Sequence, residues 1–346
     1  MKKGTTWRKS DLVLLATISF LIGFLIAFGL MIFYLFFSTD SASNQDRMMQ
    51  MKSIGKNGQP EHHASRHINP SLSVENRLPK ESDEQIAERE QLWEASTVIR
   101  NALYQYVIHH GQMPKQLTKL TEAQPNNFLT AIPSNPINHS NQVATDYVSQ
   151  SAGWIYHPQP VASEQPSKIK QLVEKALIPR VSEEMAIDFE PLRLVISKAA
   201  HQLLLVSGDV VLDRYPVALG ENDTTPIGEF SIEKKLVMPN RDYYSATNNP
   251  YGTRALALSD PTFAIHGTNQ PEKIGTDVSN GCIRMTNQAI EALYAKVSLH
   301  TPVEIVQEQP SLSTSVKSHT EATAMLYDHT AYSKEEDRST FYSWAR

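Results

Sequence analysis

Cys282 is the single cysteine of the 346-residue chain, and His266 lies sixteen positions before it in the stretch AIHGTNQPEKIGTDVSNGCIRM. A thiol with an ordinary pKa of about 8.5 is mostly protonated at neutral pH, so it needs a base or a positive field to become a nucleophile. An imidazole at the end of an adjacent strand would supply that base. These residues predict acyl transfer with Cys282 as nucleophile and His266 as base; the alternative is an inert buried thiol beside a satisfied core histidine.

The run SNGC adds a second feature that favours negative charge. Gly281 permits a tight turn, and the consecutive backbone N–H groups of Asn280, Gly281 and Cys282 can converge as a nest for a tetrahedral oxyanion. Asp277 is a third candidate, but it lies five residues from Cys282 in a loop. A backbone carbonyl near Gly267 can orient an imidazole equally well. We therefore expect a Cys–His pair without a catalytic carboxylate.

These residues must be positioned by strands, because the sequence from Leu192 onward shows short apolar runs and period-two alternation between turn residues. The predicted fold is mainly β, within an α+β class, with an antiparallel or mixed, sandwich-like sheet and one or two helices. The expected strands cover 192–197, 202–206, 210–219, 225–237, RALALS, TFAIHG and 301–306, with a helix over 287–296.

A different pattern precedes the strands. From Gln85, apolar residues recur every three to four positions, and Gly111 stands where a helix C-cap belongs. Short, proline-punctuated segments follow, so we expect a small α+β domain at 85–160 that folds separately. A polar helical connector is expected at 161–190. The tail at 309–346 is expected to be disordered, with scattered aromatic residues that could bind a partner.

The N-terminal region predicts a membrane anchor. Residues 12–37 carry no charge over 26 positions, which at ~1.5 Å per residue exceeds the ~30 Å hydrocarbon core of a bilayer. A cleaved signal peptide is the alternative, but its apolar region is only about 7–15 residues long. Four basic residues precede the segment and two follow it closely (Lys2, Lys3, Arg8 and Lys9; Arg47 and Lys52). The positive-inside rule then places residues 1–11 in the cytoplasm and the rest outside, with a flexible linker at 38–84.

Charge and composition exclude some partners. With 32 basic and 37 acidic residues, the net charge is −5, and no basic footprint for nucleic acid is present. Three histidines in the linker (His62, His63 and His67) lack the acidic or cysteine ligands that would close a metal site, so we interpret them as solvated. In an oxidising exterior, a lone cysteine cannot form an intramolecular disulfide, which favours a thiol that is either buried or used.

The motifs HGTN and SNGCIRM, with YPVALG, TPIGEFSI and NPYGTRALALS upstream, resemble the L,D-transpeptidase (YkuD-type) catalytic domain over about residues 191–308. Asn280 stands where many members of that family carry histidine. Residues 85–160 more loosely resemble the globular part of type II secretion pseudopilins, which we take as an indication of shape only. The first resemblance implies an acylated Cys282, His266 as its base, Gly267 as the backbone partner of the imidazole, and a substrate site lined by Ser279 and Arg284.

The resemblance also implies a reaction. The thiolate attacks a peptidoglycan tetrapeptide stem at the carbonyl before D-Ala, and an amine of a second stem resolves the acyl-enzyme into a 3-3 cross-link, without a metal or organic cofactor. Arg284 would suit a substrate carboxylate. Three alternatives remain open at this point: an L,D-carboxypeptidase that uses water, a ligase that attaches protein to the wall, and an inactive wall-binding module.

Overall fold

The computed structural model describes residues 82–162, 165–180, 187–245, 247–312, 314–315 and 341–344. The expected membrane span at 12–37, and the expected linker as far as residue 81, lie outside these ranges. Within these ranges no helix has the length and apolarity needed to cross a bilayer. The chain from Arg77 onward forms one compact unit.

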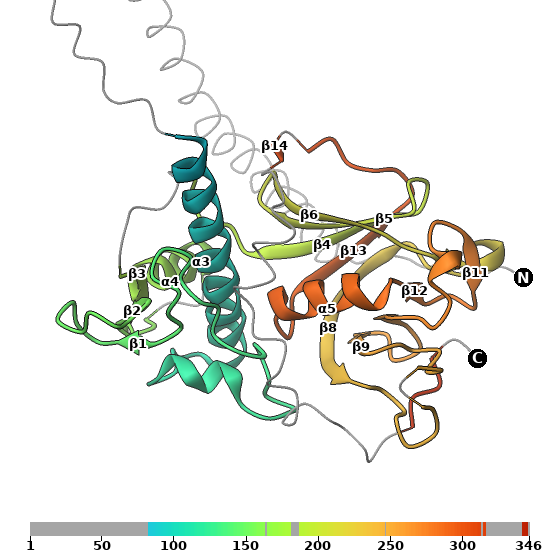
Figure 1. Ribbon diagram of the computed structural model, residues 1–346, viewed down its shortest axis with the longest axis horizontal. Helices are drawn as coiled ribbons and strands as arrows, with labels where there is room; N and C mark the ends of the chain where they lie inside the picture. The colour runs from blue at the N-terminus through green and yellow to red at the C-terminus, as the bar shows by residue number, and fades with distance from the viewer. Residues whose placement is uncertain are drawn as a thin grey trace, which may run out of the picture. The chain divides into compact units, whose positions relative to one another are not determined.

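A mixed β-sheet forms the larger part of this unit (Figure 1). Its nine strands in the described ranges lie in the order β12-β10-β9-β8-β13-β4-β5-β6-β14. The β10–β12, β4–β13 and β6–β14 pairs are parallel, and the others are antiparallel. The mainly β, mixed character is confirmed, but the strands form one continuous sheet instead of the sandwich that we expected. They are β4 (Leu192–Ser197), β5 (Gln202–Ser207), β6 (Val210–Pro216), β8 (Gly228–Val237), β9 (Arg254–Leu258), β10 (Ala264–His266), β12 (Ile283–Arg284), β13 (Pro302–Val306) and β14 (Thr314–Ser315).

The central strands are buried on both faces. On β4, Leu194 and Ile196 belong to the main hydrophobic cluster, whereas Val195 packs on the opposite face with Leu204 and Val206 of β5. A strand covered on both sides has an almost continuous apolar sequence. This explains why LRLVIS and QLLLVS were recognisable as strands, and β4 has the predicted bounds.

The long helix α3 (Asp83–His110) begins two residues before the expected Gln85 and ends at the expected C-cap, Gly111. Ser82 and Gln85 form a capping box at its N-terminus, and Gly111 ends it in the left-handed conformation with a φ of 67°. A 3-10 turn, η1 (Leu117–Thr121), packs against it. The shorter helix α5 (Asn287–Lys296) starts at the Thr286 N-cap and packs against β9 and β10.

A small three-stranded sheet lies beside α3 (Figure 1). It contains β1 (Val143–Ala144), β2 (Trp154–Tyr156) and β3 (Leu177–Pro179), and α4 (Pro166–Ala176) packs on α3. Part of the expected polar connector is therefore an ordered part of this sheet, because β3 pairs antiparallel with β2.

Helix α3 also contacts the large sheet, contrary to our expectation of a separately folding segment. Asn101 is fully buried; its Nδ2 donates to Ser298 Oγ (3.1 Å) and Thr301 Oγ1 (3.2 Å), and its Oδ1 accepts from the Leu192 N–H (3.0 Å). Residues from both parts share one hydrophobic cluster. The contact was not recognisable because the helix face that makes it is polar, and a polar face normally indicates solvent exposure.

A buried ion pair strengthens the same junction. Lys296 of α5 lies 2.7 Å from Glu94 of α3 and 2.6 Å from Asp213 of β6. Burial lowers the pKa of Lys296, but the two carboxylates raise it by more, so the ammonium stays charged. One cation therefore joins three elements that are far apart in the sequence.

Candidate active site

Strands β10 and β12 place His266 and Cys282 on one face of the sheet. The two strands are parallel, with Ile265 opposite Ile283 and His266 opposite Arg284. Side chains two residues apart on a strand share a face, so Cys282, two residues before Arg284, projects on the same side as His266. Strands ~4.8 Å apart with a rise of ~3.3 Å per residue give a diagonal of ~8 Å between their backbones, which two side chains can bridge. Both residues line one pocket.

The turn before Cys282 is held by two hydroxyl groups. Ser279 Oγ donates to the Cys282 carbonyl (2.7 Å) and accepts from the Gly281 N–H (3.0 Å). Thr225 Oγ1 donates to the Gly281 carbonyl (2.9 Å) and accepts from the Gly220 N–H (2.8 Å). Gly281 has a φ of 132°, and a Cβ there would lie 2.5 Å from the Phe263 ring. The turn thus requires glycine and fixes the direction of the following thiol.

The imidazole of His266 has a defined orientation. Its Nδ1 lies 2.5 Å from the carbonyl oxygen of Gly267. Because a carbonyl oxygen can only accept a hydrogen bond, Nδ1 carries the proton and Nε2 is the acceptor nitrogen of the neutral ring. Gly267 is therefore the backbone partner that we expected. A Cβ at this glycine would lie 2.2 Å from Asn287 Oδ1.

Burial keeps both groups neutral. It raises the pKa of the Cys282 thiol to about 11, against the lowering effects of a hydrogen bond with the Ala264 backbone and of the Arg284 charge. It lowers the pKa of the His266 imidazole to about 4, although the hydrogen bond to Gly267 raises it; the Arg284 charge lowers it further. At neutral pH the resting site is therefore a thiol beside a neutral imidazole.

Aromatic rings surround the pair, and sequence analysis did not assign them to the site. Tyr251 meets the His266 ring edge-on at 5.3 Å, and Trp344 lies parallel to that ring at 6.3 Å. The pocket between them has a volume of about 270 Å³. It is lined by Tyr244, Pro250, Tyr251, His266, Ser279, Asn280, Cys282, Arg284 and Trp344. No sequence signal placed Trp344 there, whereas Thr225 belongs to the TPIG turn already noted.

Other candidate residues have different positions. Arg284 is half-buried at the pocket wall, and its Nε is buried with no hydrogen bond to any residue that the structure describes. Asn280 is exposed at the pocket. The Gly281 N–H donates to Ser279, so it is not directed at an oxyanion as the nest model required. Asp277 pairs with His201 at 2.9 Å, which accounts for it without a catalytic role.

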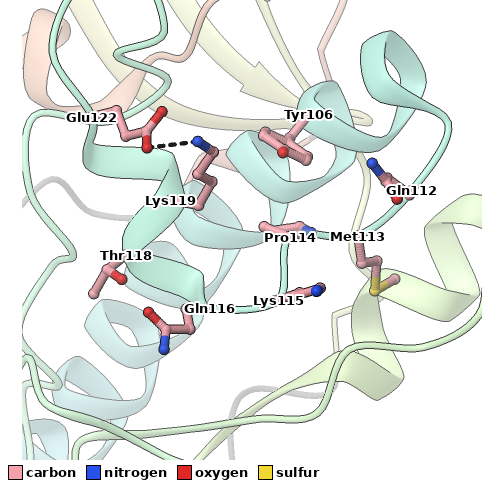
Figure 2. A pocket seen from close by; sticks show the side chains of 9 residues that line it. All are labelled: Tyr106, Gln112, Met113, Pro114, Lys115, Gln116, Thr118, Lys119 and Glu122. Carbon is pink, nitrogen blue, oxygen red and sulfur yellow. Dashed lines mark hydrogen bonds and ion pairs between the residues drawn. The ribbon is translucent and has the colours of Figure 1, made fainter.

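A larger cavity of about 470 Å³ lies at the end of α3, lined by Tyr106, Gln112, Met113, Pro114, Lys115, Gln116, Thr118, Lys119 and Glu122. Figure 2 shows Lys119 and Glu122 joined by an ion pair at its wall, where the two side chains are 2.6 Å apart on the η1 turn. Its lining has neither a nucleophilic thiol nor an imidazole, so the chemistry belongs to the Cys282 pocket. No cluster of three or more potential metal ligands occurs in the part of the chain that the structure describes.

Known proteins share this catalytic region. Residues 191–305 match the L,D-transpeptidase catalytic domain model named YkuD. The chain is 38% identical over 119 residues to a putative L,D-transpeptidase YkuD of Bacillus licheniformis, covering 34% of this chain and 67% of that protein. It is 34% identical over 131 residues to a putative L,D-transpeptidase YqjB of Bacillus subtilis, covering 34% and 73%. A solved L,D-transpeptidase from Mycobacterium smegmatis has 23% identity and a TM-score of 0.27, covering 33% of this chain and 58% of that one. The chain therefore belongs to the YkuD family of L,D-transpeptidases and carries the catalytic domain of these enzymes in residues 191–305.

Proposed function

We propose that this protein is a membrane-anchored L,D-transpeptidase that cross-links peptidoglycan stem peptides through a Cys282 acyl-enzyme. The observation that carries the proposal is the pairing of β10 with β12, which puts Cys282 and His266 on one face of the sheet above a common pocket. The tautomer of His266 supports it, because the Gly267 carbonyl leaves Nε2 as the proton acceptor.

The first half-reaction forms the thioester. His266 Nε2 takes the Sγ proton while sulfur attacks the carbonyl carbon between the third stem residue and D-Ala. The C–N bond then breaks, and the proton passes from Nε2 to the nitrogen of D-Ala, which leaves as a neutral amine. In the second half, an amine of another stem attacks the thioester, His266 Nε2 takes a proton from that amine and passes it to sulfur, and the C–S bond breaks to leave the new amide and the free thiol. No metal or organic cofactor takes part.

The neighbouring residues act on charge and position. We assign the oxyanion to the backbone N–H of Cys282, with Asn280 as a second donor from the exposed side of the turn. Ser279 and Gly281 hold that turn in place. Arg284 is suited to a substrate carboxylate, because its guanidinium lines the pocket and its Nε has no hydrogen bond to any described residue.

The anchoring part of the proposal rests on the uncharged run at 12–37 and the basic residues before it. It places the catalytic domain outside the cytoplasm, where a wall polymer would be accessible. A reporter enzyme that is active only outside the cytoplasm should be active when it is fused after Gln309. Activity of a reporter that works only in the cytoplasm would contradict this topology.

Intact-mass spectrometry tests the chemistry. The purified chain should gain an acyl adduct from tetrapeptide-bearing muropeptides, and Cys282→Ala should gain none. His266→Ala should slow acylation but keep slow modification by strong electrophiles, since the thiol retains some nucleophilicity. An adduct that persists without the thiol would overturn the assignment. Product masses separate the acceptors: a cross-linked dimer indicates an amine, a tripeptide indicates water, and a protein conjugate indicates a ligase.

A further inference from the structure

The C-terminal residues Phe341–Trp344 are fixed against the catalytic domain. Asn240 Nδ2 donates to the Tyr342 carbonyl (2.6 Å), and the Tyr342 N–H donates back to Asn240 Oδ1 (2.8 Å). Phe341 meets Tyr243 edge-on at 4.7 Å, and the Lys234 ammonium lies 5.6 Å from the Tyr342 ring centroid. Asn240 is 4% exposed, so this paired amide contact is shielded from water. The segment is held by specific contacts at each of its aromatic side chains.

These contacts orient Trp344 toward the thiol. Its indole stacks on Tyr342 with centroids 4.6 Å apart, and meets Tyr251 edge-on at 5.4 Å. Trp344 and Tyr342 belong to the same buried cluster as Cys282. Only 5% of the surface of Trp344 is exposed to solvent. One side of its indole lines the pocket, and the rest of the ring is packed against the protein.

The segment does not fill the site. A pocket of about 270 Å³ remains between Trp344, the Cys–His pair and Arg284. That volume lies just below the range of roughly 300–1,000 Å³ typical of small-molecule sites. A blocking segment would occupy the space beside the thiol, whereas this one forms a wall and leaves a small, partly polar chamber. The chamber suits a small terminal residue whose carboxylate is near Arg284, while the carbonyl of the residue before it is near Cys282.

We propose that Trp344 is a substrate-contacting residue that restricts the site to a small terminal residue on the acyl donor, and that the Asn240–Tyr342 pairing holds it in position. The inference rests on the proposed function, since it concerns the same acyl donor. It explains why the segment FYSW carries three aromatic residues within four positions, two of them buried against the catalytic domain. Truncation of the indole would enlarge the chamber by the volume of the ring. The enlarged chamber would then admit larger terminal residues.

The test compares donors that differ only in size. Full-chain wild type, Trp344→Ala and Trp344→Phe are assayed for kcat/KM with tetrapeptides that end in D-Ala or in D-Phe, with Tyr147→Ala as an exposed aromatic control. Because contacts of this kind discriminate by ~10–200-fold, Trp344→Ala should reduce the preference for D-Ala over D-Phe by at least ~10-fold, with Trp344→Phe intermediate. Tyr147→Ala should match wild type.

A chain ending at residue 340 supplies the second measurement. It should lose kcat/KM for the D-Ala donor, and a synthetic FYSWAR peptide should restore part of it. Faster turnover after the deletion, or inhibition by the peptide, would show a blocking segment and overturn the inference. An unchanged donor preference in Trp344→Ala would also overturn the inference. The proposed function would still stand in that case if wild type forms the acyl adduct and Cys282→Ala does not. If wild type forms no adduct, the proposed function and the inference fail together.

Discussion

At the scale of single residues, the protonation state of the pair decides when the enzyme is reactive. A preformed thiolate would be open to alkylation and oxidation in an oxidising compartment. Burial of Cys282 and His266 disfavours both charged forms, while the Arg284 charge favours the thiolate and disfavours the imidazolium. The buried thiol is thus neutral at rest, and under the proposed mechanism His266 takes its proton only as sulfur attacks the substrate carbonyl.

The pH dependence of thiol alkylation tests this resting state. In wild type, the iodoacetamide rate at Cys282 should keep rising with pH toward the thiol pKa of about 11. Deleting residues 341–346 uncovers the thiol, so its pKa should fall and the thiolate fraction at pH 8 should rise. Each unit of pKa is a factor of ~10 in thiolate, so we expect alkylation at pH 8 to accelerate at least ~10-fold. Identical pH profiles for both chains would contradict the role of burial.

The shared position of Cys282 and His266 at one pocket could be predicted from sequence, because the two residues lie close together in the chain. Cys282, His266 and their glycines fall within one loop and its flanking strands, so strand pairing alone brings them together. Thr225 and Trp344 reach the site through tertiary contacts from distant segments. The Gly281 N–H was assigned wrongly because a nearby serine hydroxyl competes for it, which a pattern of residue types does not reveal.

At the scale of secondary structure elements, Asn101 is the residue on which the junction of α3 with the large sheet depends. Asn101→Ala removes the acceptor of the Leu192 N–H and the donor to Ser298 and Thr301, all in a water-excluded contact. Unsatisfied buried groups of this kind should lower the free energy of unfolding by about 2–4 kcal/mol. Urea denaturation measures it. Glu88→Ala, on the exposed part of the same helix, should stay within about 0.5 kcal/mol of wild type, and an equally small effect of Asn101→Ala would argue against the junction.

Helices and strands could be predicted where their burial gives the apolar residues a regular spacing in the sequence, and less well where it does not. The bounds of β4 and α5 agree with the pattern because each buries a regular set of apolar side chains. The three-residue strand β3 is too short to show a period, and its hydrogen bonds to β2 come from a partner more than twenty residues earlier. The ordered C-terminal residues were missed because their packing partners, Asn240 and Tyr251, belong to distant loops.

At the scale of the whole molecule, the described parts of the helical region and the catalytic sheet form one compact unit. They share a hydrophobic cluster, and the buried Asn101 and Lys296 contacts cross between them. Disrupting either part exposes buried polar groups in the other, so neither should unfold alone. We expect one urea transition for the described part of the chain.

Two local probes can test that expectation in the same titration. Trp93 and Trp154 are fully buried in the helical part, and in a Trp344→Phe background, which removes the tryptophan beside the thiol, their fluorescence reports on that part. The reactivity of Cys282 toward a brief pulse of thiol reagent reports on the catalytic sheet. Coincident midpoints, both shifted equally by Asn101→Ala, are the expected result, because the substitution weakens a contact that both parts need. Separate midpoints, with the thiol exposed while tryptophan fluorescence stays native, would instead support the separate folding that the sequence first indicated. In that case the buried ion pair at Lys296 would join two domains that open independently. The carboxylates of Glu94 and Asp213 would then be hydrated when the domains separate.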